Sequence, residues 1–592
     1  MPPIQTWCRK GAPRFLIAVT AVLVFACSPE ESGNARDVAE VGKSSVAVGT
    51  GEGTGSIYGN YLAGRFAENE ADLGFAANMI ERVLEENPSD PEILRRAFVL
   101  NLGAGNGKRA VELADRLTKL GSSLTSATLL LAVNDLKNRK PDEALKRADS
   151  LAENGLARFS KPIARAWILA SMKRYDDALK ALDPLVAEKG FATMHGMHAG
   201  LIEELAGRDE AAEKRYRALI ADPKEASARV IRVMASNLQR NGKKDEAEKL
   251  IRSKLDTNDE SMILNEDLAR LNEGKKLERV VTTASQGLAE GLFNLASALP
   301  RDRAENVVLL YARIALVLEP GFDLAGLLVG DVMMSRERYR DAIETYRAID
   351  SKNAYGWSAR LRVADALYEL KKLDEATALL EEMAKERPDR VDALVNLGNY
   401  LRYKEKFKEA VAAYDRAFKR VDGASDTNWS LYYSRGIALE RSGEWERAES
   451  DFLKALELQP EHPYVLNYLG YSWVERGKNL EKAQAMIERA VQQRQNDGYI
   501  VDSMGWVLYR LGKYDESVKH LERAVQLRPQ DPVINDHLGD AYWRVGRKHE
   551  ARFQWHRAIS FKPEDEEKAK IEAKLEKGMG PAEPVGKAGS GG

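Results

Sequence analysis

The sequence predicts an all-α protein built as an α-solenoid, in which antiparallel helix pairs stack one after another. Three observations predict it: a small residue recurs every 34 residues, a glycine precedes many of these positions, and a proline follows several of them. With 592 residues, the chain is also too long for one compact core. A repeated unit divides it instead.

The first observation is a series of alanines, broken for one stretch and shifted at a few steps by one or four residues. Small side chains at such positions let the two helices of a pair approach closely. The members are Ala76, Ala110, Ala144, Ala178, Ala212, Ala247, Ala342, Ala376, Ala410, Ala448, Ala483, Ser517 and Ala551.

The other markers keep the same phase. A glycine stands twelve or thirteen residues before its alanine, at Gly64, Gly330, Gly398, Gly436, Gly470, Gly505 and Gly539. An aromatic or apolar residue three positions before the alanine is expected at the turn, at Tyr175, Tyr339, Leu373, Phe407, Trp445 and Tyr514. A proline that stops the second helix follows at Pro88, Pro388, Pro460, Pro529 and Pro563.

Together these markers resemble the tetratricopeptide repeat, and the resemblance covers Ile57 to Pro563. It implies a superhelix of about fourteen helix pairs. The phase is lost at 256–320, which we interpret as degenerate repeats that bend or divide the solenoid into arrays at 57–255 and 321–563. One continuous superhelix with atypical repeats is the alternative. Residues 564–577 are expected to form a charged capping helix, and 578–592 a disordered tail.

The first 26 residues predict a secretory signal peptide. Arg9, Lys10 and Arg14 precede an apolar run at 15–25, which is too short for a transmembrane helix. Residues 24–27, Val-Phe-Ala-Cys, resemble the lipobox of bacterial lipoproteins, which implies lipidation of Cys27. Cleavage after Ala26 without lipidation is the alternative, giving a soluble periplasmic or secreted protein.

The position after Cys27 and the composition beyond it extend this interpretation. By the same resemblance, Ser28 implies delivery to the outer membrane, with the protein on its periplasmic side. Residues 27–56 then comprise the lipidated cysteine and a flexible tether rich in Ser, Gly, Glu and Val.

Composition disfavours several classes of function. The formal charge of -2 gives no overall attraction to nucleic acid. The glycine-rich segment from Gly103 to Arg109 does not have the residue spacing of a phosphate-binding loop, so we interpret it as a turn between helices. His195 and His198 have no cysteine or acidic residue placed nearby that would complete a metal site. Cys8 and Cys27 are the only cysteines. The sequence therefore predicts no catalytic residue, no metal, no cofactor and no enzyme.

The repeat register predicts a partner-binding groove. By resemblance to tetratricopeptide arrays, the first helix of each pair lines the concave surface, and repeat positions 2, 5, 9, 12 and 13 face it. In the last three full repeats the candidate groove residues are Tyr464, Asn467, Tyr471, Tyr499, Asp502, Trp506, Tyr509, Arg510, Asp536, Asp540, Trp543 and Arg544. Exposed aromatic and arginine side chains are typical of protein-binding hot spots. A core role is the alternative for most of the aromatic residues.

The charges of the groove indicate its partner. The peptide-binding version of this fold grips a C-terminal carboxylate with lysine at positions where Asp502 and Asp536 stand here. We therefore expect a protein partner that presents apolar and basic groups.

The chain resembles long outer-membrane tetratricopeptide lipoproteins that act as adaptors of periplasmic C-terminal processing proteases and deliver cell-wall hydrolases to them. This implies a non-enzymatic scaffold at the outer membrane. An assembly scaffold for polysaccharide export or a pilus is an alternative. An enzyme fused to the repeats is a third, but the only block outside the repeat phase is short, at 256–320. A purely structural role, in which the protein spaces its partners without binding them tightly, is a further alternative.

Overall fold

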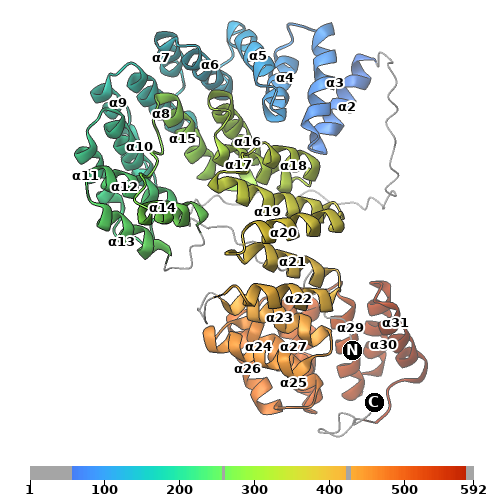
Figure 1. The fold of residues 1–592 in the computed structure, drawn as a ribbon. Helices are drawn as coiled ribbons and strands as arrows, with labels where there is room; N and C mark the ends of the chain where they lie inside the picture. Colours follow the sequence, from blue (N-terminus) through green and yellow to red (C-terminus); the bar gives the residue numbers. More distant parts are fainter. Residues whose placement is uncertain (1–55, 256–260, 422–427, 582–592) are drawn as a thin grey trace. The chain divides into compact units, whose positions relative to one another are not determined.

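The computed structural model describes residues 56–255, 261–421 and 428–581 (Figure 1). All regular secondary structure in these ranges is helical, so the predicted all-α class is confirmed. The predicted signal peptide, Cys27, nearly all of the predicted tether and the tail from 582 onward lie outside the described residues. No helix in the described ranges is both long enough and apolar enough to span a bilayer.

The described chain forms two compact units, which divide between Ala376 and Thr377. The N-terminal unit contains α2 (Ile57–Asn69), α3 (Leu73–Glu86), α4 (Pro91–Ala104), α5 (Gly107–Lys119), α6 (Thr125–Lys137), α7 (Pro141–Asp149), α8 (Ala157–Ser171), α9 (Tyr175–Ala181), the 3₁₀ turn η1 (Asp183–Leu185), α10 (Ala192–Leu205), α11 (Asp209–Leu219), α12 (Ala228–Arg240), α13 (Lys244–Leu255), α14 (Met262–Asn272), α15 (Ala284–Ser297), α16 (Arg301–Leu318), α17 (Asp323–Ser335), α18 (Tyr339–Arg347) and α19 (Ala354–Glu369). The division falls within α20 (Leu373–Glu386).

The C-terminal unit continues the alternation of first and second helices. It contains α21 (Asp392–Tyr403), α22 (Phe407–Phe418), α23 (Trp429–Arg441), α24 (Trp445–Leu458), α25 (Pro463–Glu475), α26 (Leu480–Gln493), α27 (Gly498–Arg510), α28 (Tyr514–Leu527), α29 (Pro532–Arg544), α30 (Lys548–Ser560) and α31 (Asp565–Lys577). The last helix coincides with the predicted charged cap.

The sequence markers have the structural roles expected of them. The alanines of the series are fully buried in second helices, at 0% exposure, and Ser517 at the same position donates to the Gly505 carbonyl at 2.7 Å. The marker glycines face an aromatic or branched side chain: a Cβ atom on Gly398 would lie 2.4 Å from the Tyr414 ring. Any larger residue at Gly398 would therefore push the two helices apart.

Turn residues set the ends of the helices. Tyr175, Tyr339, Phe407 and Tyr514 each begin a second helix. At the start of α29, Asp531 accepts from the backbone N–H of Val533 and Ile534 at 3.0 and 3.1 Å, which caps the helix. Proline follows within a few residues of the end of α3, α20, α24, α28 and α30, because it cannot continue a helix.

The stretch without repeat phase is helical in its described part. It contains α14, α15 and α16, and α16 is kinked at Ala304, where the backbone leaves the helical region. In Figure 1, α15 and α16 lie on the inner side of the arc made by the preceding helix pairs of the same unit. The predicted division of the chain at 256–320 stays a prediction. The compact units separate further along, and this stretch packs onto the N-terminal array.

Candidate protein-binding surfaces

The inner side of the N-terminal array is covered by its own chain. Helix α15 packs against α8 and α10, while α16 packs against α4 and α6. Two glycines permit the close approach of α15: a Cβ atom on Gly287 would lie 2.2 Å from the Trp167 ring, and one on Gly291 would lie 2.4 Å from Ile163. Since both neighbours belong to α8, the glycines set the distance between α8 and α15.

A buried histidine links three helices at this contact. The indole N–H of Trp167 donates to Nδ1 of His198 at 3.2 Å, and the side-chain amide of Asn294 lies 3.3 Å from Nε2. Burial lowers the pKa of His198 to about 4, so the ring is neutral near pH 7. With Nδ1 accepting, the neutral ring carries its proton on Nε2, the atom that faces the Asn294 side-chain amide. Both ring nitrogens of His198 are thus used in packing.

A buried ion pair fixes α15 to the array at a further point. Arg229 of α12 donates from Nε to Oε1 of Glu290 in α15 at 3.0 Å, and a second contact joins Nη2 to Oε2. Glu290 is almost fully buried. Removing either partner would leave a buried charge without compensation. The pair therefore requires α15 to stay against α12.

Helix α16 is held to the array by two hydrogen bonds, each from a basic side chain to a backbone carbonyl. Arg313 donates to the Gly103 carbonyl at 3.1 Å, and Lys137 donates to the Val317 carbonyl at 2.5 Å. The Gly103 to Arg109 segment contains the end of α4 and the start of α5, as its inter-helix interpretation predicts. The hairpin formed by α15 and α16 thus occupies the inner face that the resemblance assigned to a partner.

The C-terminal unit carries all twelve candidate groove residues, on α25, α27 and α29. Nine of them keep part of their surface: Tyr464, Tyr471, Tyr499, Trp506, Tyr509, Arg510, Asp536, Trp543 and Arg544. The other three correct the prediction, because Asn467 is 0%, Asp540 4% and Asp502 6% exposed. These three side chains lie beneath the surface and cannot touch a partner directly.

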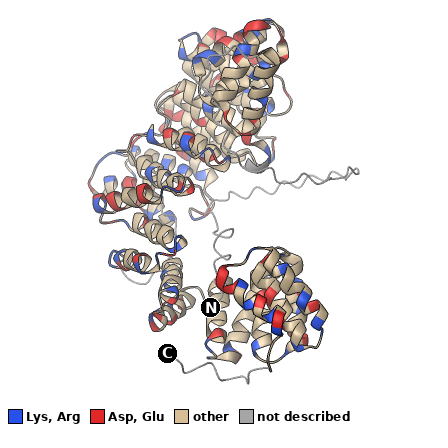
Figure 2. Ribbon diagram, turned by 90° about the vertical axis from the view of Figure 1, so that its right-hand side faces the viewer, with Lys and Arg blue, Asp and Glu red and all other residues tan. Residues whose placement is uncertain are grey.

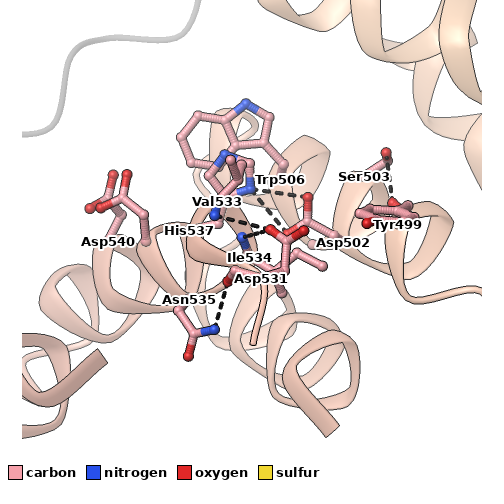
Figure 3. A network of polar contacts seen from close by, with 12 residues as sticks. Tyr499, Asp502, Ser503, Trp506, Asp531, Val533, Ile534, Asn535, His537 and Asp540 are labelled. Carbon is pink, nitrogen blue, oxygen red and sulfur yellow. Dashed lines mark hydrogen bonds and ion pairs between the residues drawn. The ribbon is translucent and has the colours of Figure 1, made fainter. Parts of the chain in front are cut away.

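Trp506 is held from three sides, one of which is the ring of His537 (Figure 3). Its ring stacks on Tyr509 at a centroid distance of 4.8 Å and on His537 at 4.1 Å, with the planes inclined by 7° and 15°. Its N–H donates to Oε1 of Glu475 at 2.6 Å, and Arg510 donates to the same oxygen at 3.1 Å. A partly exposed aromatic ring fixed in this way is already in one orientation before any partner arrives.

The buried aspartate below Trp506 supports His537. Nδ1 of His537 lies 3.0 Å from Oδ1 and 3.1 Å from Oδ2 of Asp502, and both residues are buried. Burial by itself would lower the pKa of His537, but the Asp502 carboxylate outweighs burial and raises the pKa to about 9. The imidazole is therefore protonated near pH 7 and donates to Asp502.

The candidate surface of the last repeat is covered by the capping helix. Lys574 of α31 donates to Asp536 at 2.8 and 2.9 Å and to Asp540 at 2.7 and 2.8 Å. Asp540 also accepts from the Trp555 indole at 2.9 Å. Burial, with the nearby Asp536, raises the pKa of Asp540 to about 6. The pair of aspartates thus already binds an ammonium group of the same chain.

The residues after α31 continue this cover. Trp543 donates to the Met579 carbonyl at 3.2 Å, and Arg544 donates to the Gly580 carbonyl at 2.6 Å. Arg544 also donates to the Tyr509 hydroxyl at 3.1 Å. Residues 578–580 of the tail that the sequence predicts as disordered are therefore described and lie against α29. Only the candidate residues on α25 and α27 are left without this cover.

Three residues of this surface were not predicted from the sequence: Glu475, His537 and Lys574. Glu475 stands one helical turn after Tyr471, so the register could have placed it on the same face. His537 is adjacent to Asp536 in sequence, but it does not occupy one of the repeat positions that face the groove. Lys574 gives no repeat signal, because it belongs to the cap.

Charge does not divide the molecule into acidic and basic faces. Figure 2 shows lysine and arginine interspersed with aspartate and glutamate on the helices of both units. Within the described ranges, no group of three or more histidine, cysteine or acidic side chains has the arrangement of a metal site. The candidate surface is thus distinguished by its fixed aromatic rings and buried carboxylates.

Comparison with known proteins identifies the repeats. Models of the tetratricopeptide repeat match residues 333–398, 395–463 and 433–498, and a further TPR repeat model matches 505–546. The chain is 26% identical over 200 residues to a TPR repeat-containing protein of Pseudomonas aeruginosa, PA4667. The match covers 34% of this chain and 33% of that protein, so it spans about a third of the relative. The chain therefore contains tetratricopeptide repeats, as predicted.

The solved structures that the chain matches include Cut9 and Tom70. The Cut9 structure, solved with Hcn1, is 15% identical, with coverage of 89% and 97% and a TM-score of 0.38. Yeast Tom70 is 14% identical, with coverage of 88% and 95% and a TM-score of 0.31. The stacked helix pairs and the matches to the repeat models show that the chain is an α-solenoid.

Proposed function

We propose that this tetratricopeptide-repeat solenoid is a protein interaction scaffold whose partner surface lies on α25 and α27. The observation that carries the proposal is Trp506, partly exposed and fixed by Tyr509, His537 and Glu475. Aromatic rings held in one orientation are effective binding anchors, because little conformational entropy remains to be lost on binding. Tyr464, Tyr471 and Tyr499 extend the aromatic surface along the same two helices.

Within the described residues, the inner face of the N-terminal array offers no comparable open surface, which supports placing the partner surface on α25 and α27. Its inner face is occupied by α15 and α16, which are joined to it by Trp167, His198 and the Arg229–Glu290 pair. A partner would have to displace buried contacts there. On α25 and α27 the partner would meet side chains that keep exposed surface.

The charges favour a basic partner. Glu475 lies at the edge of Trp506. The aspartates that stand where a carboxylate clamp would need lysine do not face a partner, because Asp502 is buried against His537 and Asp536 is paired with Lys574. We propose that the partner inserts apolar side chains beside Trp506 and places lysine or arginine near Glu475.

We further propose that the scaffold is lipidated at Cys27, lies on the periplasmic side of the outer membrane, and acts as an adaptor for a periplasmic C-terminal processing protease and its cell-wall hydrolase substrates. This finer function is supported by the lipobox-like residues 24–27 and by the sequence resemblance described above. It is independent of the Trp506 surface, so the two are tested separately.

The surface is tested by affinity purification and mass spectrometry from the membranes of the source bacterium, followed by measurement of Kd with the recovered partner. We expect Trp506→Ala to weaken binding about tenfold or more. The matched control is Phe553→Ala, an exposed aromatic ring on α30 of the same unit. Unchanged affinity of Trp506→Ala, with circular dichroism like that of wild type, would refute the surface.

A second variant covers the case in which Trp506→Ala unfolds the repeat. Arg510 is partly exposed and donates to Glu475 at 3.1 Å. We expect Arg510→Ala to keep the fold and to weaken binding relative to the wild type, and unchanged affinity of this folded variant would refute the surface. Recovery of a protease in the purification supports the adaptor role, whereas recovery of export-channel or pilus components instead rejects it.

The anchor has its own test. Labelling with radioactive palmitate is expected to mark the wild-type protein and not Cys27→Ala. Absence of label from the wild type would overturn the lipidation proposal and leave the Trp506 surface untouched.

A further inference from the structure

The first helix carries a row of exposed apolar side chains. Tyr58, Leu62 and Phe66 are 81%, 66% and 68% exposed. Their spacing of four residues places them on one face of α2, along about 12 Å of helix. Ile57 of α2 and Phe75 of α3 are 38% and 37% exposed. The other large apolar side chains that are exposed in the described ranges, Leu120, Val186, Leu453 and Phe553, stand singly on separate elements.

This row, Tyr58, Leu62 and Phe66, is not needed for the fold of the first repeat. The opposite face of α2 packs on α3 through Gly64 and Ala67, and a Cβ atom on Gly64 would lie 3.0 Å from Ile80. The exposed row faces away from that contact. It is the surface that a preceding repeat would cover, and α2 begins the described array.

The two ends of the solenoid differ in this respect. Terminal repeats normally present a polar outer face. The C-terminal end follows this rule, because α31 is made mostly of glutamate and lysine. The N-terminal end does not, so an apolar surface is expected to cover α2.

The sequence before α2 indicates what that surface is. Cys27 stands 30 positions before Ile57. The Ser- and Gly-rich composition between them predicts a coil of about 30 Å r.m.s. length. If the cysteine is lipidated, as proposed above, α2 is confined near the lipid surface at an effective concentration in the millimolar range. Tyrosine, phenylalanine and leucine are side chains that enter the interface of a bilayer.

A second copy of the chain fits the row less well. Three to five side chains along about 12 Å supply less than the roughly 800 Å² per partner of a standard protein interface. A membrane contact that is assisted by a lipid anchor needs less area, because the tether has already removed most of the translational freedom.

We propose that Tyr58, Leu62 and Phe66 insert into the lipid surface and lay α2 on the membrane, which orients the first repeat. This inference rests on the proposed lipidation of Cys27. The contact gives the N-terminal unit a second attachment point besides the lipid, while the surface on α25 and α27 stays a protein-binding surface.

The experiment supplies the tether artificially. The chain from residue 27 to 592 carries a hexahistidine in place of Cys27 and is held on vesicles of phosphatidylethanolamine, phosphatidylglycerol and a nickel-chelating lipid. Because no other cysteine remains, Leu62→Cys can be labelled with the environment-sensitive dye NBD. Leu120→Cys is the matched control, an exposed leucine of the same unit at the end of α5.

We expect the fluorescence of the label at 62 to rise at least about twofold on the vesicles and to be quenched by brominated lipid, as for other interfacial helices. The label at 120 should change little. Replacing Tyr58 and Phe66 by serine in the Leu62→Cys chain should abolish both effects without changing its circular dichroism.

Two results would overturn the proposal. One is a label at 62 that behaves like the label at 120 while all of the protein is on the vesicles. The other is a rise that depends on protein concentration without lipid, which would assign the row to a second copy. The tether in this experiment is artificial and does not depend on lipidation of Cys27. A negative palmitate-labelling result would therefore reject only the lipid anchor at Cys27, and it can be told apart from the two results that overturn the membrane contact of α2.

Discussion

The imidazole ring of His537 lies parallel to the indole ring of Trp506, with centroids 4.1 Å apart and planes inclined by 15°. The two residues belong to α29 and α27, so the stack joins the first helices of adjacent repeats. Below it, the Asp502 carboxylate accepts from His537 at 3.0 Å. The orientation of the candidate anchor Trp506 therefore depends on a buried charged pair.

This pair predicts a pH dependence of stability in the C-terminal unit. The pKa of His537 is raised to about 9 in the fold, against an unfolded value of about 6.5. Its contribution is therefore complete below pH 6.5 and is lost as the pH rises through 9, by at most about 3 kcal/mol. Urea unfolding followed by circular dichroism between pH 6 and 10 measures it.

The variant His537→Gln should lose this pH dependence. The matched control is His556→Gln, an exposed histidine of the neighbouring α30. The explanation fails if His537→Gln keeps the wild-type fall in stability over that pH range.

A second prediction concerns Glu567 of α31. Its Oε1 is buried and has no hydrogen-bond partner among the described residues, and burial raises the pKa of the carboxyl to about 7. A raised acid pKa costs stability once the group ionises, so this cost grows between pH 4.5 and 7. We expect Glu567→Gln to stabilise the unit by about 1 to 2 kcal/mol at pH 8 and by less at pH 5. Thermal unfolding at the two pH values measures this gain.

The control for that variant is Glu566→Gln on the solvent side of the same helix, where the side chain is 74% exposed. Equal effects of the two substitutions at pH 8 would contradict the assignment of the cost to burial.

Removal of Lys574 should detach the cap. Lys574→Met leaves Asp536 and Asp540 without their ammonium partner, and breaking a buried ion pair costs about 3 kcal/mol. Lys568→Met, in an exposed pair with Glu572, should change stability by less than about 0.5 kcal/mol. Limited proteolysis measures the difference, with cleavage after α30 expected only in Lys574→Met. Comparable resistance of both variants would contradict the role of Lys574.

The packing of α15 is tested at its glycine. In Gly287→Ala the new methyl group would lie 2.2 Å from the Trp167 ring, so we expect a loss of about 1 to 3 kcal/mol. Gly321→Ala, where no atom lies within 4 Å, is the control. Urea unfolding of both variants measures the cost. If Gly287→Ala is as stable as Gly321→Ala, the tight contact between α15 and α8 is wrong.

The repeat register could be predicted because its signals are local. The Gly398 marker and the alanine Ala410 follow from the contact of two neighbouring helices, and Gly398 does face Tyr414 within the same repeat. The same register placed Trp506 and Asp502 on the first helix of one repeat. The register did not predict how deeply each side chain is buried. Asp502 lies beneath Trp506, with only 6% of its surface exposed.

The sequence by itself determined the helix pairs, their small-residue contacts and the line of first-helix residues that includes Trp506. Only the tertiary structure decided which of these first-helix residues are exposed and which are covered by other parts of the chain. Gly103 meets Arg313 across 210 residues, and Asp536 meets Lys574 across 38. Neither contact repeats along the chain, so no periodic signal in the sequence records it. The physical reason is that a solenoid repeats its nearest-neighbour packing, whereas the α15–α16 hairpin and the α31 cap each fill their surfaces only once.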